Sequence, residues 1–190
     1  VTGVQTCALP LSVHKISIIS RGRAAGYTIH LPLEDRKMQS KKEFLDDIAV
    51  TLGGFAVEEM QFGDITTGPS NDLQVATGLA RDMVTRFGMS EAIGPIALES
   101  NGGRTIGGGK GIDGSEYSAS VGATVDAEVK KIVEGGLIRA REIVTAHKPA
   151  LVAIAKRLIE VETIEREEYE QIIIAHGIQP KKKLDIEHQN

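Results

Sequence analysis

Apolar residues recur at helical spacing over most of this chain after Ser40, and this periodicity limits the possible folds more than any other feature. Ser40 followed by Glu43 is a capping-box pattern, which marks the start of a helix. The apolar residues behind it follow the i, i+3/i+4 rhythm of one amphipathic helix: Phe44, Leu45, Ile48, Ala49, Leu52, Ala56, Val57 and Met60. A second such stretch begins where Ser70 or Asn71 can cap it and ends at Gly88.

The second half of the chain predicts further helices. Residues 121–146 and 150–160 have helical periodicity and are separated at Lys148-Pro149, because a helix tends to end before the residue that precedes proline. Thr163 is expected to begin a short last helix that Gly177 ends. The sequence therefore predicts a mainly α-helical fold.

A small β element is expected near the start. The alternation in Lys15-Ile16-Ser17-Ile18 predicts one strand from about Val13, and Tyr27–Leu31 predicts a second. A basic, glycine-containing turn joins them. We expect a hairpin or an edge pair, with β structure confined to residues 15–31.

Composition excludes several classes of function. The chain has 190 residues, 41% hydrophobic and 25% charged, which suits one main globular domain. Its net charge of −4 argues against a nucleic-acid partner. No apolar run approaches the roughly 20 residues that cross a bilayer, so we expect this chain to be soluble and any membrane anchor to lie outside it. The single Cys7 cannot form an internal disulfide, which fits a reducing compartment.

Three segments are expected to stand apart from the main domain. Residues 1–12 have neither helical periodicity nor the layout of a signal peptide, and we interpret them as a non-native leader. Residues 101–115 contain seven glycines and few large apolar groups, which predicts a mobile surface loop. Residues 178–190 form a polar tail. The domain itself is expected over residues 13–177.

Four blocks of sequence stand out within that domain. They are Arg21–Thr28, Leu31–Arg36, Gly53–Glu59 and Thr66–Leu73. Together they resemble the peptidase domain of the FtsH-like AAA+ zinc metalloproteases, in the family's order and at nearly its spacing, from about Val13 to about His176. The resemblance implies an FtsH-type peptidase fold that is truncated at its N-terminal side.

The resemblance also implies a parent function. It is that of a hexameric, ATP-dependent zinc metalloendopeptidase that degrades unfolded and membrane proteins at the cytoplasmic face of the bacterial inner membrane. Members of this family carry N-terminal membrane helices and an ATPase module that binds ATP and Mg²⁺, and neither is present in this sequence. Polypeptide substrates are the expected partners.

Asp72 is the candidate metal ligand. On the residues alone it is an acidic group in the first turn of a predicted helix, where the helix dipole favours it by about 0.3–1 kcal/mol. In the family that the chain resembles, the Asp of the Thr-Thr-Gly-x-x-Asn-Asp motif is the third zinc ligand. It completes a site begun by the two histidines of H-E-x-x-H. A carboxylate held at a helix N-terminus is a competent oxygen ligand for zinc.

The rest of that zinc site is missing from the sequence. No histidine begins an H-E-x-x-H motif, and no two are four residues apart, so two ligands and the general-base Glu are absent. We therefore assign no catalytic residue and expect the chain alone to be inactive. The five histidines are interpreted as single surface or half-buried groups: His14, His30, His147, His176 and His188.

Two further sites follow from the resemblance. Glu58 lies on the helix that the family packs beside its zinc helix, where it could accept the free N–H of a ligand histidine. The alternative for Glu58 is a solvated helix face. The same two interpretations apply to neighbouring Glu59, and Glu58 is the preferred candidate. The segment Gly26, Tyr27, Thr28 and Ile29 resembles the strand at the family's active-site cleft, where an unfolded chain can pair by main-chain hydrogen bonds. An ordinary edge strand is the alternative.

A second class of function remains open. The chain could be a non-catalytic helical module that serves oligomerisation or interaction and has no chemistry of its own. The upstream gene would separate the two readings, because an ATPase followed by H-E-x-x-H supports the protease.

Overall fold

A computed structural model describes residues 11–20, 26–32, 38–99 and 117–180 of the chain. The expectations for residues 1–10, the glycine-rich segment 101–115 and the tail beyond residue 180 lie outside this described part. Six helices and three strands occur within it: β1 (Leu11–Ser17), β2 (Tyr27–Pro32), α2 (Lys41–Thr51), α3 (Gly53–Phe62), α4 (Ser70–Thr85), α5 (Ala119–Ala146), α6 (Lys148–Val161), β3 (Thr163–Glu165) and α7 (Arg166–Ala175). The prediction of a mainly helical fold with a small β element is confirmed.

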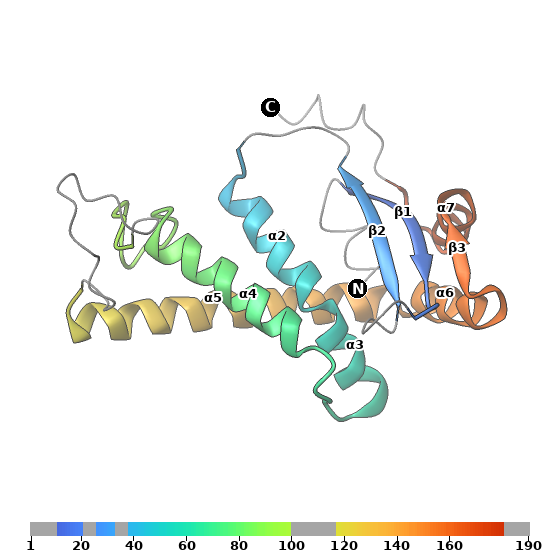
Figure 1. Ribbon diagram of the computed structural model, residues 1–190, viewed down its shortest axis with the longest axis horizontal. Helices are drawn as coiled ribbons and strands as arrows, with labels where there is room; N and C mark the ends of the chain where they lie inside the picture. Colours follow the sequence, from blue (N-terminus) through green and yellow to red (C-terminus); the bar gives the residue numbers. More distant parts are fainter. Residues whose placement is uncertain (1–10, 21–25, 33–37, 100–116, 181–190) are drawn as a thin grey trace.

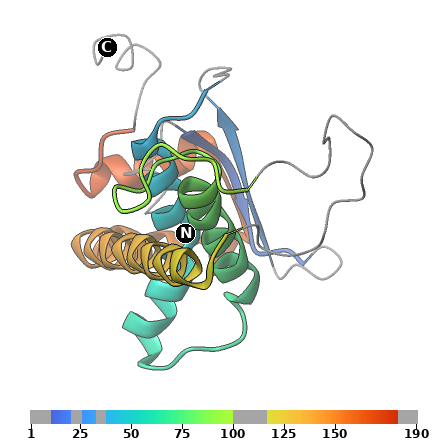
Figure 2. The same ribbon diagram turned by 90° about the vertical axis from the view of Figure 1, so that its left-hand side faces the viewer.

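Helices α5 and α6 follow one another along the long axis of the molecule (Figure 1). Helices α2, α3 and α4 pack on α5, whereas the sheet lies at the end formed by α6 and α7 (Figure 1). Figure 2 looks along the molecule from the end where α5 begins. The junction between α5 and α6 falls at His147, as the proline at position 149 predicts. None of the helices in the described ranges is long and apolar enough to cross a membrane.

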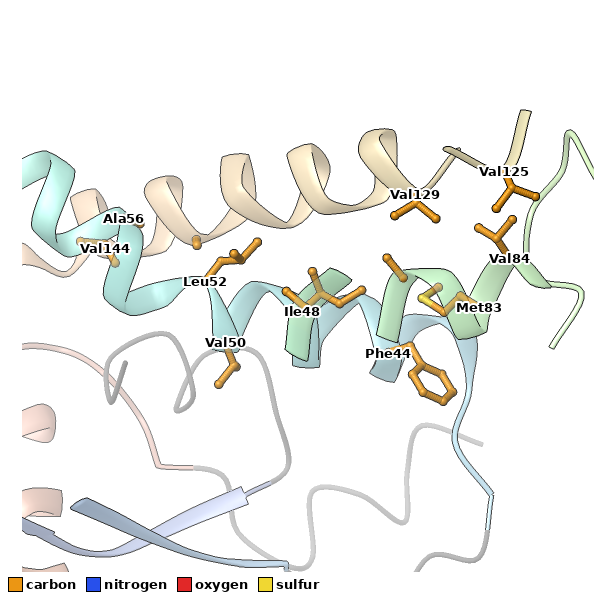
Figure 3. Packing of buried hydrophobic residues seen from close by; sticks show 13 residues of the cluster. Phe44, Ile48, Val50, Leu52, Ala56, Met83, Val84, Val125, Val129 and Val144 are labelled. Carbon is orange, nitrogen blue, oxygen red and sulfur yellow. The ribbon is translucent and has the colours of Figure 1, made fainter. Parts of the chain in front are cut away.

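Helix α2 begins with the predicted capping box. The Ser40 hydroxyl accepts a hydrogen bond from the Glu43 backbone N–H, and the Glu43 carboxylate accepts one from the Ser40 N–H at 2.7 Å. The prediction of one helix from Ser40 to Met60 is wrong, because the chain changes direction at Leu52 and starts α3 at Gly53. Leu52 is buried at this bend, so both helices can face α5 (Figure 3).

The structure confirms most of the predicted apolar face of α4. Four members of that face are buried: Ala76, Ala80, Met83 and Val84. Leu73 and Phe87, at the two ends, are exposed. The capping prediction is wrong, because Ser70 and Asn71 lie inside the helix and Pro69 occupies the N-cap position without a side-chain hydrogen bond. Helix α4 ends at Thr85 with Arg86 at its C-cap, before the predicted stop at Gly88, although Gly88 does adopt a left-handed φ of +60°.

The main core lies between α2, α3, α4 and α5, whose buried side chains face one another in Figure 3. Its fully buried members include Ile48 and Leu52 from the N-terminal helices, Met83 from α4 and Val125 from α5. The rings of Phe44 and Phe87 add a tilted aromatic contact with centroids 5.3 Å apart.

The sheet has a third strand that the sequence did not predict. Its order is β2-β1-β3, with both neighbours antiparallel to β1. Thr163 was expected to begin a helix, but it begins β3, and α7 starts only at Arg166. The Ser17 and Thr163 hydroxyls lie 2.9 Å apart across β1 and β3. A second core forms where the buried side chain of Ile164 meets β1, α6 and α7.

Strand β1 departs from the predicted alternation. A register shift between Val13 and Lys15 places two residues opposite one on β2. Val13 and Ile16 consequently both enter the second core, although they are three residues apart. Ser17 is buried, whereas Ile18 lies beyond the strand and is 45% exposed. The expected pairing of Ile16 with Ile18 on one face is therefore wrong.

Candidate functional site

A short polar turn connects α3 to α4, and the first turn of α4 carries the candidate ligand. Helix α3 ends at Gly63, which adopts φ of +66° and donates its N–H to the Glu59 carbonyl at 3.0 Å. Residues 63–68 that follow are all exposed. The Ser70 N–H donates to the Thr67 carbonyl at 3.2 Å, which closes the turn into the first residue of α4.

Asp72 lies in the first turn of α4, as predicted, and its residue is half-buried. Within the described part of the chain, its carboxylate makes no hydrogen bond or ion pair with another side chain. The free N–H groups and the dipole of a helix N-terminus favour a negative charge at this position. Asp72 is therefore an accessible oxygen donor that is not engaged by the described residues.

Glu58 faces the same turn from α3. Its Oε2 atom accepts two hydrogen bonds from Thr66, one from the backbone N–H at 3.2 Å and one from the Oγ1 hydroxyl at 2.9 Å. The sequence did not reveal this contact, because it joins residues across the bend between two helices. The role of Glu58 as the partner of a ligand histidine stays a prediction.

Glu59 points to a different neighbour. Its carboxylate accepts a bidentate pair of hydrogen bonds from Arg141 on α5, at 2.7 Å from Nε and 2.9 Å from the terminal nitrogen. Both side chains are more than a third exposed, so this pair contributes little to stability. The two adjacent glutamates thus do different things, and only Glu58 contacts the turn before Asp72.

The described histidines do not gather near Asp72. His14 and His176 are exposed, and His147 is half-buried at the junction of α5 and α6. His30 lies in β2, and His188 lies outside the described residues. In the described ranges, no three His, Cys, Asp or Glu side chains come together in a way that could hold a metal ion. Asp72 fits the role of one ligand, but these residues alone do not complete a set.

Strand β2 lies at one edge of the described sheet, where β1 is its single neighbour among the described strands. Tyr27, Thr28 and Ile29 belong to it, and Ile29 is exposed. Gly26 precedes the strand rather than forming part of it. A β-carbon at Gly26 would lie 2.7 Å from the Ser17 carbonyl oxygen, so this glycine allows the close approach of the two strands.

The sequence did not predict a polar cluster of Arg81, Glu99 and Tyr117. It connects Glu99 and Tyr117, the residues on either side of segment 100–116. Arg81 on α4 donates to the Tyr117 hydroxyl at 2.9 Å, and that hydroxyl donates to the Glu99 carboxylate at 3.2 Å. Burial by itself would lower the pKa of Arg81, but the neighbouring Tyr117 and Glu99 outweigh it and leave the pKa above its ordinary value. The cluster joins two chain positions that are far apart in sequence.

Comparison with known proteins connects this geometry to a family. The model of peptidase family M41 matches residues 6–172. The FtsH 1 protein of Conexibacter woesei, an ATP-dependent zinc metalloprotease, is 44% identical over 85% of the chain. The ATP-dependent zinc metalloproteases FtsH of Bacillus subtilis and Thermotoga maritima are 40% identical over 94% and 44% identical over 85% of the chain.

The helical domain and Asp72 in the first turn of α4 both lie inside the segment that the peptidase family model matches. The chain belongs to peptidase family M41, which confirms the resemblance to FtsH-like proteases. It spans about a quarter of the length of these relatives, from 25% to 28% of each. The activities of the full-length relatives are therefore only proposed for this chain.

Proposed function

We propose that this chain supplies one zinc ligand, Asp72, to the catalytic centre of an ATP-dependent zinc metalloendopeptidase. The supporting observation is the half-buried Asp72 in the first turn of α4, unengaged by other described side chains and inside the segment matched by family M41. Zinc bound there would provide Lewis-acid chemistry and an activated water. The chain's own contribution is to hold the carboxylate at the helix N-terminus.

The other parts of the centre belong to a different segment in this proposal. Two histidines and the general-base Glu would come from an H-E-x-x-H helix upstream, as the family resemblance implies. Without that helix we expect the 190-residue chain neither to bind zinc tightly nor to cleave polypeptides. An ATPase module that binds ATP and Mg²⁺ and N-terminal membrane helices would complete a hexameric protease at the cytoplasmic face of the bacterial inner membrane.

Unfolded and membrane polypeptides are the proposed substrates, and β2 is the proposed place where they pair. An edge strand offers main-chain N–H and C=O groups to any extended chain, which gives affinity with little sequence preference. Tyr27, Thr28 and Ile29 of β2 would provide these groups. Gly26 would keep the neighbouring backbone close enough for the strand to form.

A chimaera tests the proposal. The upstream part of a relative such as Bacillus subtilis FtsH, including its ATPase and zinc helix, would be joined to residues 13–177 of this chain. Zinc content per protomer and ATP-dependent cleavage of an unfolded polypeptide would be measured together. We expect both properties in the chimaera. Asp72→Ala should remove both, because a centre of three protein ligands loses one.

Two further variants make the result specific. Asp72→Asn should also weaken zinc binding severely, because a neutral amide lacks the charge of a carboxylate. Asp126→Ala removes a carboxylate that is 78% exposed on α5 and should change neither property. Normal zinc content and proteolysis in the Asp72→Ala chimaera would refute the proposal and return Asp72 to a helix-capping role. The chain would then fit the non-catalytic module.

A further inference from the structure

We propose that Glu58 is a positioning residue, which fixes the turn before α4 through Thr66 and thereby sets the direction of the Asp72 carboxylate. This inference rests on the proposed role of Asp72 as a ligand. It differs from the role expected from the family resemblance, because Glu58 would act on the turn and not on a metal-bound imidazole.

The contact between Glu58 and Thr66 is local and directional. One carboxylate oxygen of Glu58 accepts from both the N–H and the hydroxyl of Thr66, at 3.2 and 2.9 Å. Glu58 lies in α3 and Thr66 lies eight positions later, in the turn that leads to α4. The pair therefore fixes the direction in which the chain leaves α3 and enters α4.

The hydroxyl of Thr66 links Glu58 to the next residues of the turn. It donates to Glu58 and accepts a hydrogen bond from the Gly68 N–H at 3.0 Å. The Ser70 N–H then binds the Thr67 carbonyl at 3.2 Å. A continuous series of hydrogen bonds therefore runs from the Glu58 carboxylate to the first residue of the helix that carries Asp72.

Gly68 shows how closely the groups are packed. A β-carbon at this position would lie 3.1 Å from Oε1 of Glu58 and 3.1 Å from Oγ1 of Thr66. Any larger residue would push against both partners of the contact. The glycine thus leaves space for the carboxylate to reach the turn.

Little else in the described structure holds this turn. Residues 63–68 are exposed, and only Pro69 is buried before α4 begins. An exposed polar turn without apolar anchors samples several conformations unless hydrogen bonds select one. A ligand must be held within about 0.5 Å of its productive position, so the Glu58 contact would influence metal affinity more than overall stability.

The first test measures amide hydrogen exchange by NMR in the 190-residue chain. Glu58→Ala and Thr66→Val should raise the exchange rates of the Thr66 and Gly68 amides about three- to tenfold, as expected for losing one or two exposed hydrogen bonds. Glu58→Gln and Thr66→Ser should stay close to the wild type, because each retains the acceptor or the hydroxyl. Glu59→Ala, on the same helix, removes the Arg141 pair and should leave these amides unchanged.

The second test measures zinc affinity by chelator competition in the chimaera described above. Glu58→Ala and Thr66→Val should weaken zinc binding about 10- to 100-fold, the usual effect of losing an outer-sphere partner. Glu58→Gln should remain within about threefold of the wild type. If Glu58→Ala fails to fold, Thr66→Val probes the same contact without changing any charge.

The outcomes distinguish the positioning role of Glu58 from the proposed role of Asp72 as a zinc ligand. Retained zinc in Asp72→Ala refutes the ligand assignment itself. Lost zinc in Asp72→Ala with unchanged affinity in Glu58→Ala and Thr66→Val refutes only the positioning role. If Glu58→Gln is as harmful as Glu58→Ala while Thr66→Val has no effect, Glu58 acts by its charge, and our inference is wrong.

Discussion

Gly136 of α5 and Ile48 of α2 approach so closely that no side chain fits between them. A β-carbon at residue 136 would lie 2.6 Å from Cγ2 of Ile48, a side chain with no exposed surface. A β-carbon at the neighbouring Gly135 would have no such contact within 4 Å. Two adjacent glycines in one helix therefore have opposite packing environments.

Gly136→Ala should lower the free energy of unfolding by about 1–3 kcal/mol, because an overpacked core forces backbone shifts. Gly135→Ala is the matched control and should raise it by about 0.5–1 kcal/mol, since alanine is the better helix former. Urea unfolding of both variants measures the difference. Equal effects of the two substitutions would show that the helices separate without cost.

The buried carboxylate of Asp46 depends on Arg139. Asp46 is 5% exposed, and the Arg139 guanidinium lies 2.7 Å from its Oδ1 atom. Arg139→Ala leaves this charge without its partner and should cost about 1–3 kcal/mol, which is less than a fully buried pair because Arg139 is half exposed. Arg141→Ala, which breaks the exposed pair with Glu59, should cost less than about 1 kcal/mol. Chemical denaturation measures the loss of unfolding free energy in both variants. A larger loss in Arg141→Ala than in Arg139→Ala would contradict this prediction.

Ser90 makes stability depend on pH through Glu128. The Ser90 hydroxyl donates to the Glu128 carboxylate at 2.8 Å and lowers the pKa of Glu128 below its ordinary value. A lowered carboxyl pKa stabilises the fold above the unfolded value of about 4.3, and this stabilisation disappears as pH falls through the folded value. Ser90→Ala should therefore lose more stability at pH 7 than at pH 3, as unfolding at several pH values would show.

Asp47 provides the opposite case. Burial raises the pKa of Asp47, so its ionised form opposes folding at neutral pH, and protonation relieves that penalty as the pH falls. Asp47→Asn should stabilise the chain at pH 7, and the gain should shrink in acid. A gain that grows below pH 4 would contradict this sign.

The Tyr117 hydroxyl bonds to both Arg81 and Glu99, whose side chains also contact each other directly at 3.4 Å. Tyr117→Phe removes both hydrogen bonds and should lower stability by about 1 kcal/mol. Exchange of the Leu98 and Glu99 amides, which both donate to the Thr85 carbonyl, should become faster. Asp126→Ala removes a more distant partner of Arg81, at 3.9 Å, and should leave those amides unchanged. Equal exchange in the Tyr117→Phe variant would show that the hydroxyl does not hold this cluster.

Local signals in the sequence predicted the elements that depend on near neighbours. The capping box at Ser40, the helix boundary before Pro149 and the left-handed turn at Gly88 are all set by residues within one turn. The placement of Asp72 in a first turn follows from the same local rules. Its proposed chemistry came from family resemblance and not from periodicity.

Features that depend on distant partners could not be predicted in this way. Thr163–Glu165 is too short to show alternation, and it becomes a strand because it pairs with β1. The bulge after Val13 lets Val13 and Ile16 enter the same core although they are three residues apart, and no glycine or proline marks it. The Glu58–Thr66 contact likewise needs the bend at the end of α3, which periodicity does not describe.

The central position of β1 has a consequence for how the molecule forms. Strand β1 occupies residues 11–17, but its second neighbour, β3, is made by residues 163–165. During synthesis the helices α2 to α5 can collapse on one another while β1 still has an unpaired edge, because the strand that covers it emerges only after α5 and α6. A nascent chain stalled before residue 163 therefore exposes a template for aggregation that the finished protein covers with three residues.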